Sequence, residues 1–333
     1  MLPFNSDFEP PWWCMNPHLQ TIWPQLFRTA PDPGYRRERL ELDDGDFLDI
    51  DWLEPDLDSP IVLIAHGLGG NSRSHYVRGL VDELSAAGLR SAVVHHRGCS
   101  GQPNRLPRSY HGGHSEDLDA AIRRLRKQEP GTPLFAAGYS LGGSMLIHWL
   151  SRNHHILTAA CVVSVPWGLA ESADRMERGL ARIYQGHLVS RMKRQLLRKA
   201  ESVVLPVDIP ALGRVKTFRQ FDNMITAPCH GFRDAQEYYA LCSPRRLLRE
   251  IRTNTLIIHA ADDPMMTVQV IPEEDELPLG GNLKFELSRR GGHCGFVRGS
   301  WPHQARYWAE RRVTNYFRSN LDPYGARIDT SSW

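Results

Sequence analysis

Short apolar runs recur along this chain at intervals that suit alternating strands and helices. Six of these runs have the length of a strand: 59–65, 90–95, 132–137, 158–165, 254–260 and 283–287. Continuous apolar runs are typical of strands that are buried on both faces of a parallel sheet. Between the runs, or after the last of them, the pattern predicts helices at 74–87, 115–128, 143–150 and 301–317.

The residues before the first apolar run have a different pattern. Segments 36–42 and 47–53 alternate polar and apolar side chains, and the sequence Asp-Asp-Gly-Asp at 43–46 separates them. This arrangement predicts two antiparallel strands joined by a tight turn. With the six apolar runs they make eight strands. The chain therefore predicts an α/β fold with a mostly parallel, doubly wound eight-stranded sheet and right-handed crossovers.

The succession of predicted strands and helices stops at both ends of the chain and is interrupted once inside it. Residues 1–34 are rich in proline, which argues against a long helix, and in tryptophan, which predicts an N-terminal arm packed on the core. Residues 167–245 show helical periodicity without a clear strand. We interpret them as a helical cap inserted into a core made of 35–166 and 246–320, with 321–333 as a poorly structured tail.

Charge and cysteine content narrow the class of protein. The net charge of +2 is too small to indicate nucleic acid as a partner. A basic run at 191–199 in the cap favours a solvated helix face over contact with anionic head groups. The six cysteines form no C-x-x-C pair, which favours reduced thiols in a cytoplasmic protein over disulfides or a zinc site.

Targeting and cofactor motifs are not recognisable in the sequence. We find no signal peptide and no run of about 18 apolar residues, so no transmembrane segment is expected, while peripheral membrane contact stays open. No H-E-x-x-H spacing and no phosphate loop of the P-loop type occurs, so we expect neither a metal nor a cofactor.

The sequence Gly-Tyr-Ser-Leu-Gly at 138–142 carries the strongest chemical signal. It fits G-x-S-x-G and lies between a predicted strand and a predicted helix. This context predicts a sharp, strained turn that exposes the hydroxyl of Ser140 as a nucleophile, with the backbone N–H of Leu141 facing a developing oxyanion. A second N–H would come from the loop after the third strand, where Leu68 in His-Gly-Leu-Gly-Gly is the candidate.

A serine nucleophile needs a base, and the base needs a carboxylate to orient it. Asp262 or Asp263 ends the strand at 254–260, and His293 follows the last strand in a Gly-Gly-His loop. Pro264 would stiffen the turn and present Asp263, so Asp263 is favoured as the acid, and Asp262 would bond to the backbone. Cys294, beside the base, lacks the strained turn of a nucleophile and is expected to pack as a small hydrophobic residue.

His114 and Asp119 have the H-x₄-D spacing that some acyltransferases use. We interpret them instead as an ordinary exposed pair on a helix.

The chain resembles the YheT-like branch of the α/β-hydrolase superfamily, also called the AB hydrolase 4 family. The resemblance covers nearly the whole sequence. Its matching motifs are Asn-Pro-His-Leu-Gln-Thr at 16–21, His-Gly-Leu-Gly-Gly at 66–70, Arg-Gly-Cys-Ser-Gly at 97–101, Gly-Tyr-Ser-Leu-Gly-Gly at 138–143 and Asp-Asp-Pro at 262–264. The chain departs from the family at 95–96 and 111–114, where extra histidines are expected near the entrance loop.

This resemblance implies a Ser–Asp–His triad and hydrolysis of carboxylic esters. We predict a serine esterase or acylglycerol lipase of class EC 3.1.1.- that acts through an acyl-enzyme on short- to medium-chain acyl esters, with a small-molecule or lipid ester as substrate. Two alternatives stay open. The same triad could transfer the acyl group to an alcohol, or the chain could be a non-catalytic binding protein of the same fold.

Overall fold

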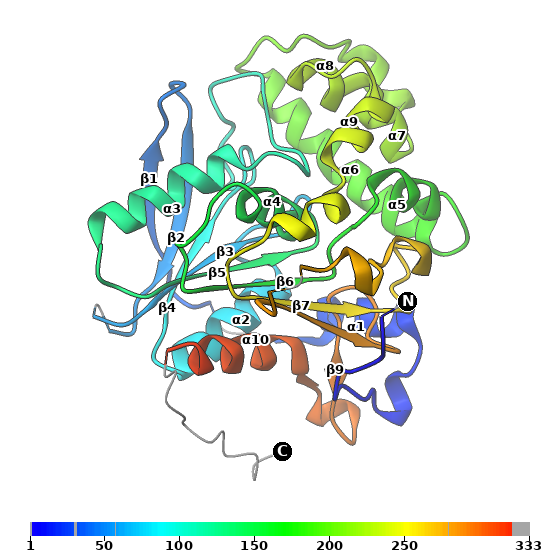
Figure 1. Ribbon diagram of the computed structural model, residues 1–333. Helices are drawn as coiled ribbons and strands as arrows, with labels where there is room; N and C mark the ends of the chain where they lie inside the picture. The colour runs from blue at the N-terminus through cyan, green and yellow to red at the C-terminus, as the bar shows by residue number, and fades with distance from the viewer. Residues whose placement is uncertain (1, 30–31, 57, 279, 322–333) are drawn as a thin grey trace.

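A single eight-stranded sheet lies at the centre of the molecule. The computed structural model describes residues 2–29, 32–56, 58–278 and 280–321. The strand order is β1-β2-β4-β3-β5-β6-β7-β8 (Figure 1). The strands are β1 (Arg36–Glu41), β2 (Phe47–Leu53), β3 (Ile61–Ala65), β4 (Arg90–Val94), β5 (Leu134–Tyr139), β6 (Ala159–Val163), β7 (Thr255–Ala260) and β8 (Leu283–Ser288). Within this sheet the antiparallel pairs are β1 with β2 and β2 with β4, and the other neighbouring strands pair in parallel, so the predicted mostly parallel α/β fold is confirmed.

Successive residues of the central strands supply two separate cores. In β3, Leu63 packs into the core on one face of the sheet, while Val62 and Ile64 pack into the core on the other. The first core is covered by α3 (Glu116–Gln128) and α4 (Leu141–Leu150), and the second by α2 (His75–Ala86) and α10 (Trp308–Ser319). Burial on both faces explains why these strands are continuous apolar runs in the sequence.

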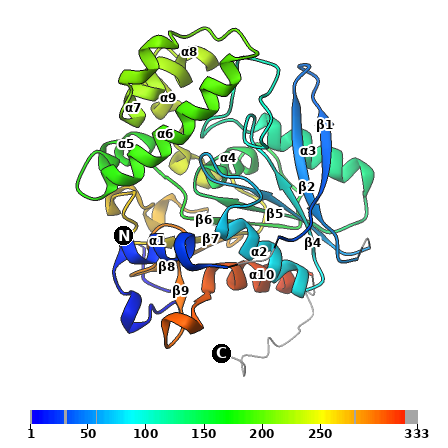
Figure 2. The same cartoon turned by 180° about the vertical axis from the view of Figure 1, so that it is seen from behind.

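The segment 167–245 is helical and contains no strand. It comprises α5 (Leu169–Met176), α6 (Ala181–Ala200), α7 (Phe218–Phe221), α8 (Ala227–His230), α9 (Ala235–Cys242), a π-helical turn (Asp222–Thr226) and a 3₁₀ turn (Pro210–Arg214). Figures 1 and 2 show these helices grouped beyond the sheet, on the side of α4. Between α5 and α6 the helical conformation is interrupted, and Gly179 there has a φ of 54°. The division of the chain into arm, core, cap and tail stays a prediction.

The N-terminal arm contains a helix, although its prolines were expected to exclude a long one. Residues Pro17–Phe27 form α1, with 11 residues. Pro17 occupies the first turn, where no backbone N–H is needed, and the side chain of Asn16 accepts hydrogen bonds from the N–H groups of residues 18 and 19. Pro24 lies inside the helix, but tertiary packing of this buried residue outweighs the local penalty.

The closing helix also begins later than predicted. It starts at Trp308, and the residues before it form a 3₁₀ turn (Pro302–Gln304) and a two-stranded ribbon of β9 (Val297–Arg298) and β10 (Arg306–Tyr307). Pairing between these two short strands, which the loop at 299–305 joins, overrides the local helical pattern here. The remaining 3₁₀ turns are Trp12–Cys14, Pro244–Glu250, Val268–Val270 and Glu274–Glu276. Of the predicted tail, 322–333 lies outside the described residues.

All six cysteines are free. Over the described ranges, we find no helix with the length and apolar character needed to cross a bilayer.

Candidate active site

Ser140 lies on a sharp turn between β5 and α4. Its φ is 51° and its ψ is −120°, a conformation that is strained for a residue with a side chain. A Cβ at Gly138 would lie 2.7 Å from the Cα of Gly143, and a Cβ at Gly142 would lie 2.4 Å from the carbonyl oxygen of His66. Strand, loop and helix approach too closely for larger residues, so the glycines of the motif permit the turn that presents Ser140 beyond the strand.

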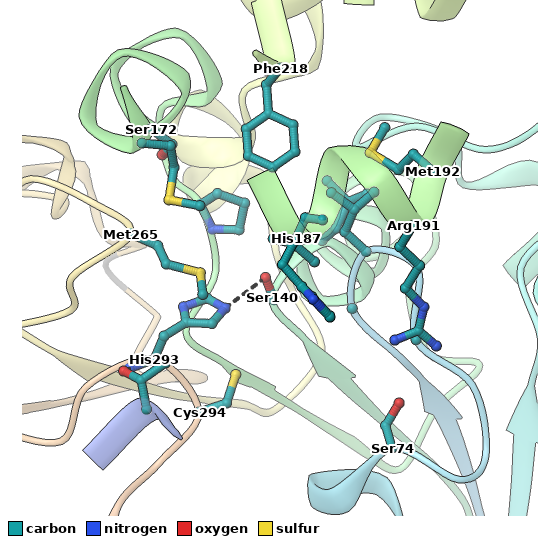
Figure 3. Close-up of a pocket in the computed structure, with 18 of the residues that line it drawn as sticks. Ser74, Ser140, Ser172, His187, Arg191, Met192, Phe218, Met265, His293 and Cys294 are labelled. Carbon is teal, nitrogen blue, oxygen red and sulfur yellow. Dashed lines mark hydrogen bonds between the residues drawn. The ribbon is translucent and has the colours of Figure 1, made fainter. Parts of the chain in front are cut away.

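Three side chains from separate parts of the sequence meet beside this turn. The Oγ of Ser140 lies 3.0 Å from Nε2 of His293 (Figure 3). Nδ1 of His293 lies 2.7 Å from Oδ2 of Asp263. Asp263 follows β7 and His293 follows β8, so both lie at the carboxyl edge of the sheet. The three residues predicted from topology are therefore within hydrogen-bond distance of one another.

The two neighbouring aspartates make different contacts. Asp263 is buried, and its Oδ1 accepts a hydrogen bond of 2.8 Å from the backbone N–H of Met265. Oδ1 of Asp262 instead accepts a bond of 3.0 Å from the N–H of Gly292. Asp263 is thus the carboxylate behind the imidazole, while Asp262 holds the backbone of the loop that carries it.

The environment of His293 favours its protonated form. Burial by itself lowers the pKa of this imidazole, but the carboxylate of Asp263 acts in the opposite direction, and the net result is a pKa well above the ordinary value. The side chain is 11% exposed, which leaves one edge of the ring open to the cavity. An imidazole of this kind can take a proton from Ser140 while the buried carboxylate stabilises the resulting charge.

Two tyrosines position the loop that carries Leu68. The hydroxyl of Tyr76 accepts a hydrogen bond of 2.9 Å from the N–H of Gly67, and the hydroxyl of Tyr110 accepts one of 2.7 Å from the N–H of Gly69. Among the described residues, the N–H of Leu68 between them has no acceptor. Leu141 is the first residue of α4, so its N–H has no acceptor within the helix either. Both amides are thus available to an incoming oxyanion.

His66 supports the same loop through hydrogen bonds to backbone groups. It is fully buried, its Nδ1 lies 2.8 Å from the carbonyl oxygen of Gly67, and its Nε2 accepts a bond of 3.3 Å from the N–H of His96. The ring of His96 stacks on Tyr110, and its Nε2 donates to the carbonyl of His66. These contacts agree with the prediction that His66 braces the loop.

From the sequence, the extra histidines were expected near the entrance loop. The structure does not place them there. His95 is buried with its Nε2 2.8 Å from Oδ2 of Asp51, and His111 packs against the cap beside Cys242. The interpretation of His114 and Asp119 as an exposed pair was also wrong. His114 is buried, and Asp119 accepts a bond of 2.9 Å from the indole of Trp149.

The N-terminal arm reaches the loop of His293. The hydroxyl of Thr21 accepts a hydrogen bond of 2.9 Å from the N–H of His293, and it donates to the carbonyl of Pro17 within α1. The buried amide of Gln20 donates to the carbonyl of Val297 and accepts from the N–H of the same residue. The arm therefore fixes the backbone on both sides of the imidazole.

A cavity of about 600 Å³ opens beside Ser140 and His293. Its volume suits a small or medium-sized organic ligand. Part of its lining is apolar and comes from the cap and from the turn after β7. These residues are Leu169, Ala173, Met176, Leu188, Met192, Phe218, Met265 and Met266.

Comparison with known proteins agrees with this geometry. Residues 60–300 match the family described as the alpha/beta hydrolase fold. The chain belongs to this family. It is 39% identical to "Putative esterase YheT" of Escherichia coli (strain K12) over 325 residues, which cover 96% of this chain and 95% of the relative. This α/β hydrolase therefore belongs to the YheT-like branch.

Other relatives carry names of lipid hydrolases. "Phospholipase ABHD3" of Mus musculus is 29% identical over 91% of this chain and 76% of its own length. "Monoacylglycerol lipase" of Saccharomyces cerevisiae is 32% identical over 80% of this chain and 60% of its own length. Among solved structures, the esterase Pf2001 of Pyrococcus furiosus has a TM-score of 0.57 at 14% identity, covering 87% of this chain and 96% of that one. At this identity the likeness shows the fold alone.

Several residues at the site of this α/β hydrolase were not identified from the sequence. Thr21 was noted only within a family motif, and Tyr76 and Tyr110 lie in segments without a catalytic signature. Their contacts with residues 293, 67 and 69 depend on tertiary packing. The position of Thr21 inside the matching motif at 16–21 was the one available signal.

Proposed function

We propose that this α/β hydrolase is a serine carboxylic-ester hydrolase that acts through an acyl-enzyme on short- to medium-chain acyl esters. The observation that carries the proposal is the continuous hydrogen-bonded line from Ser140 through His293 to Asp263 beside the cavity. The esterase and lipase names of the relatives support the same class of reaction.

In the first half of the reaction, Oγ of Ser140 attacks the carbonyl carbon of the ester, and Nε2 of His293 takes the hydroxyl proton. The carbonyl π electrons move to its oxygen, where the N–H groups of Leu68 and Leu141 stabilise the negative charge. His293 then gives its proton to the leaving alkoxide oxygen, the ester C–O bond breaks, and the acyl group remains on Ser140. Asp263 keeps the imidazole in one tautomer throughout.

The second half repeats these steps with water as the nucleophile. His293 removes a proton from water, the hydroxide attacks the acyl carbon, and the proton returns to Oγ of Ser140 as the acid leaves. If an alcohol enters in place of water, the same intermediate gives acyl transfer.

The test combines a panel of p-nitrophenyl esters of graded chain length with labelling by a fluorophosphonate. We expect Ser140→Ala to lose labelling and to lower kcat by at least about 10⁴-fold, because the nucleophile is removed. The matched control is Ser151→Ala, at the end of the same helix, where the hydroxyl bonds only to the carbonyl of His148.

Retained hydrolysis in a folded Ser140→Ala variant would disprove the proposal. Wild-type protein that neither reacts with the probe nor turns over any ester would favour the non-catalytic alternative. Product partition in water–alcohol mixtures measures transfer against hydrolysis.

A further inference from the structure

The charges of the cavity are unevenly distributed. Its lining includes four arginines: Arg28, Arg73, Arg78 and Arg191. The lining has a single carboxylate, Asp222, and that group is already bonded at 2.6 Å to the hydroxyls of Thr226 and of Tyr239. Arg28 is paired with Glu310 and Arg78 has an interaction of its own, so the positive charge that remains for a ligand comes from Arg73 and Arg191.

Arg191 differs from Arg28 in its partners. Arg28 forms an ion pair with Glu310 and lies over the ring of Tyr307, so its charge is compensated. Arg191 is half-buried, and within the described part of the chain it has no ion pair and donates no hydrogen bond. A guanidinium that is partly removed from water without an acceptor is unfavourable unless a ligand supplies one.

Arg191 lines the same cavity as Ser140 and His293. It projects from α6 onto the loop of Leu68, where its Cδ would lie 3.2 Å from a Cβ placed on Gly69. Figure 3 shows its guanidinium on the side of Ser140 that faces Ser74, while Met265 and His293 lie on the opposite side. A ligand group bonded to this guanidinium would therefore lie in the same cavity as an ester carbonyl at Ser140.

The start of α2 contributes to the same part of the cavity. Ser74, His75 and Tyr76 line it, and the first turn of this 12-residue helix contains no acidic side chain. Nδ1 of His75 is buried and has no partner among the described residues. The helix N-terminus adds partial positive charge to that of the arginines, so both features favour an anion.

We propose that the substrate is an amphiphilic ester whose alcohol part carries an anionic group, a phosphate or a carboxylate, that Arg191 binds. The acyl chain then occupies the apolar part of the cavity, between Phe218 and Met265, and the alcohol part lies toward α2. This inference rests on the proposed function and adds a substrate class and a specificity residue to it.

The test uses three butyryl esters that differ in one group: butyrylglycerol, butyrylglycerate and butyrylglycerol 3-phosphate. The quantity measured is the ratio of kcat/KM for each charged ester to that for the neutral one. We expect a preference for at least one charged ester, and the better of the two identifies the anion. In Arg191→Gln this ratio falls about 10- to 100-fold, mainly through KM, since one charge-assisted contact is lost.

Two further variants separate charge recognition from structure. Arg191→Lys keeps the positive charge and restores part of the preference. Arg194→Gln, on an exposed position of the same helix outside the cavity lining, keeps the wild-type ratio. With the wild-type enzyme, glycerol 3-phosphate or glycerate inhibits neutral-ester hydrolysis competitively, and glycerol at the same concentration does not.

The proposal is overturned if the wild-type enzyme has no preference for either charged ester. It is also overturned if Arg191→Gln lowers kcat/KM equally for charged and neutral esters, because Arg191 would then act on the step common to both. Neither result contradicts the proposal that the protein is an esterase. That proposal fails only if a folded Ser140→Ala variant still hydrolyses the neutral ester.

Discussion

Two loops at the carboxyl edge of the sheet each bring a histidine next to Ser140, and they differ in what lies behind the imidazole. His66, in the loop at 66–70, contacts backbone groups of Gly67 and His96. His293, in the loop at 291–296, contacts the carboxylate of Asp263. The residue type is the same, so the partner decides what each imidazole can do.

The pKa values express this difference. Burial lowers the pKa of His66 well below the ordinary value, and the neighbouring imidazoles act in the same direction. For His293 the carboxylate reverses the effect of burial, and the pKa is raised. His66 therefore stays neutral and holds the backbone, whereas His293 can accept and release a proton. The comparison teaches that, of these two buried histidines, the carboxylate partner marks His293 as the candidate base.

The largest expected effect on kcat comes from replacing each of the two histidines with alanine. His293→Ala removes the proposed base, and we expect kcat to fall by about 10⁴- to 10⁶-fold with little change in the free energy of unfolding. His66→Ala removes a buried brace, and we expect kcat to fall only about 10- to 100-fold, with about 2–4 kcal/mol of stability lost. Steady-state kinetics and urea denaturation of both variants measure the two quantities. Equal losses of kcat in the two variants would contradict the different roles assigned to His293 and His66.

The pH dependence of the reaction tests the carboxylate. The proposed base works only when His293 is neutral, so kcat/KM should rise as the pH rises through its raised pKa and should fall on acidification. In Asp263→Asn the group that raises the pKa is gone. The inflection should move to lower pH, and the plateau should fall by about 10⁴-fold.

Asp262→Asn is the matched control for this experiment. Burial and the nearby charge of Asp263 raise the pKa of Asp262 to about 6, but its side chain contacts the backbone of Gly292 and not the imidazole. We expect the inflection of kcat/KM to stay near its wild-type position in this variant. A shift as large as that of Asp263→Asn would show that either aspartate can orient the base.

The smallest expected effect concerns the support of the first loop. Tyr110→Phe removes the acceptor for the N–H of Gly69, and Tyr76→Phe removes the acceptor for the N–H of Gly67. We expect kcat to fall about 5- to 10-fold in each variant with KM nearly constant, since a displaced donor at Leu68 stabilises the oxyanion less. A change confined to KM would assign these tyrosines to substrate binding instead.

The sequence predicted those parts of the molecule that depend on local pattern. The turn at Ser140 follows from glycines that no other residue could replace there, and Asp263, the aspartate that Pro264 favoured, lies 2.7 Å from the imidazole of His293. Both signals lie within a few residues of the feature that they specify. The catalytic roles themselves stay predictions that kinetics must test.

The features that were missed depend on strand pairing and packing contacts that the local sequence pattern does not specify. α10 begins at Trp308 because the residues before it pair with β9, and His114 is buried because the cap covers the loop that carries it. Neither the ribbon nor the cap contact leaves a periodic signal in the sequence. Arg191 belonged to a basic run that suggested a solvated helix face, and only its position over Gly69 separates it from its neighbours.

The hydrogen bond between Thr21 and His293 has a consequence for biosynthesis. The two residues are 272 positions apart. At a translation speed of about 5–20 residues per second, the ribosome makes the arm roughly 15–55 s before the loop that the arm holds. Ser140 itself is made 153 positions before His293, so for the later part of that interval the nascent polypeptide has the proposed nucleophile without its proposed base. Hydrolysis by the proposed triad should therefore begin only when the last part of the chain has been synthesised.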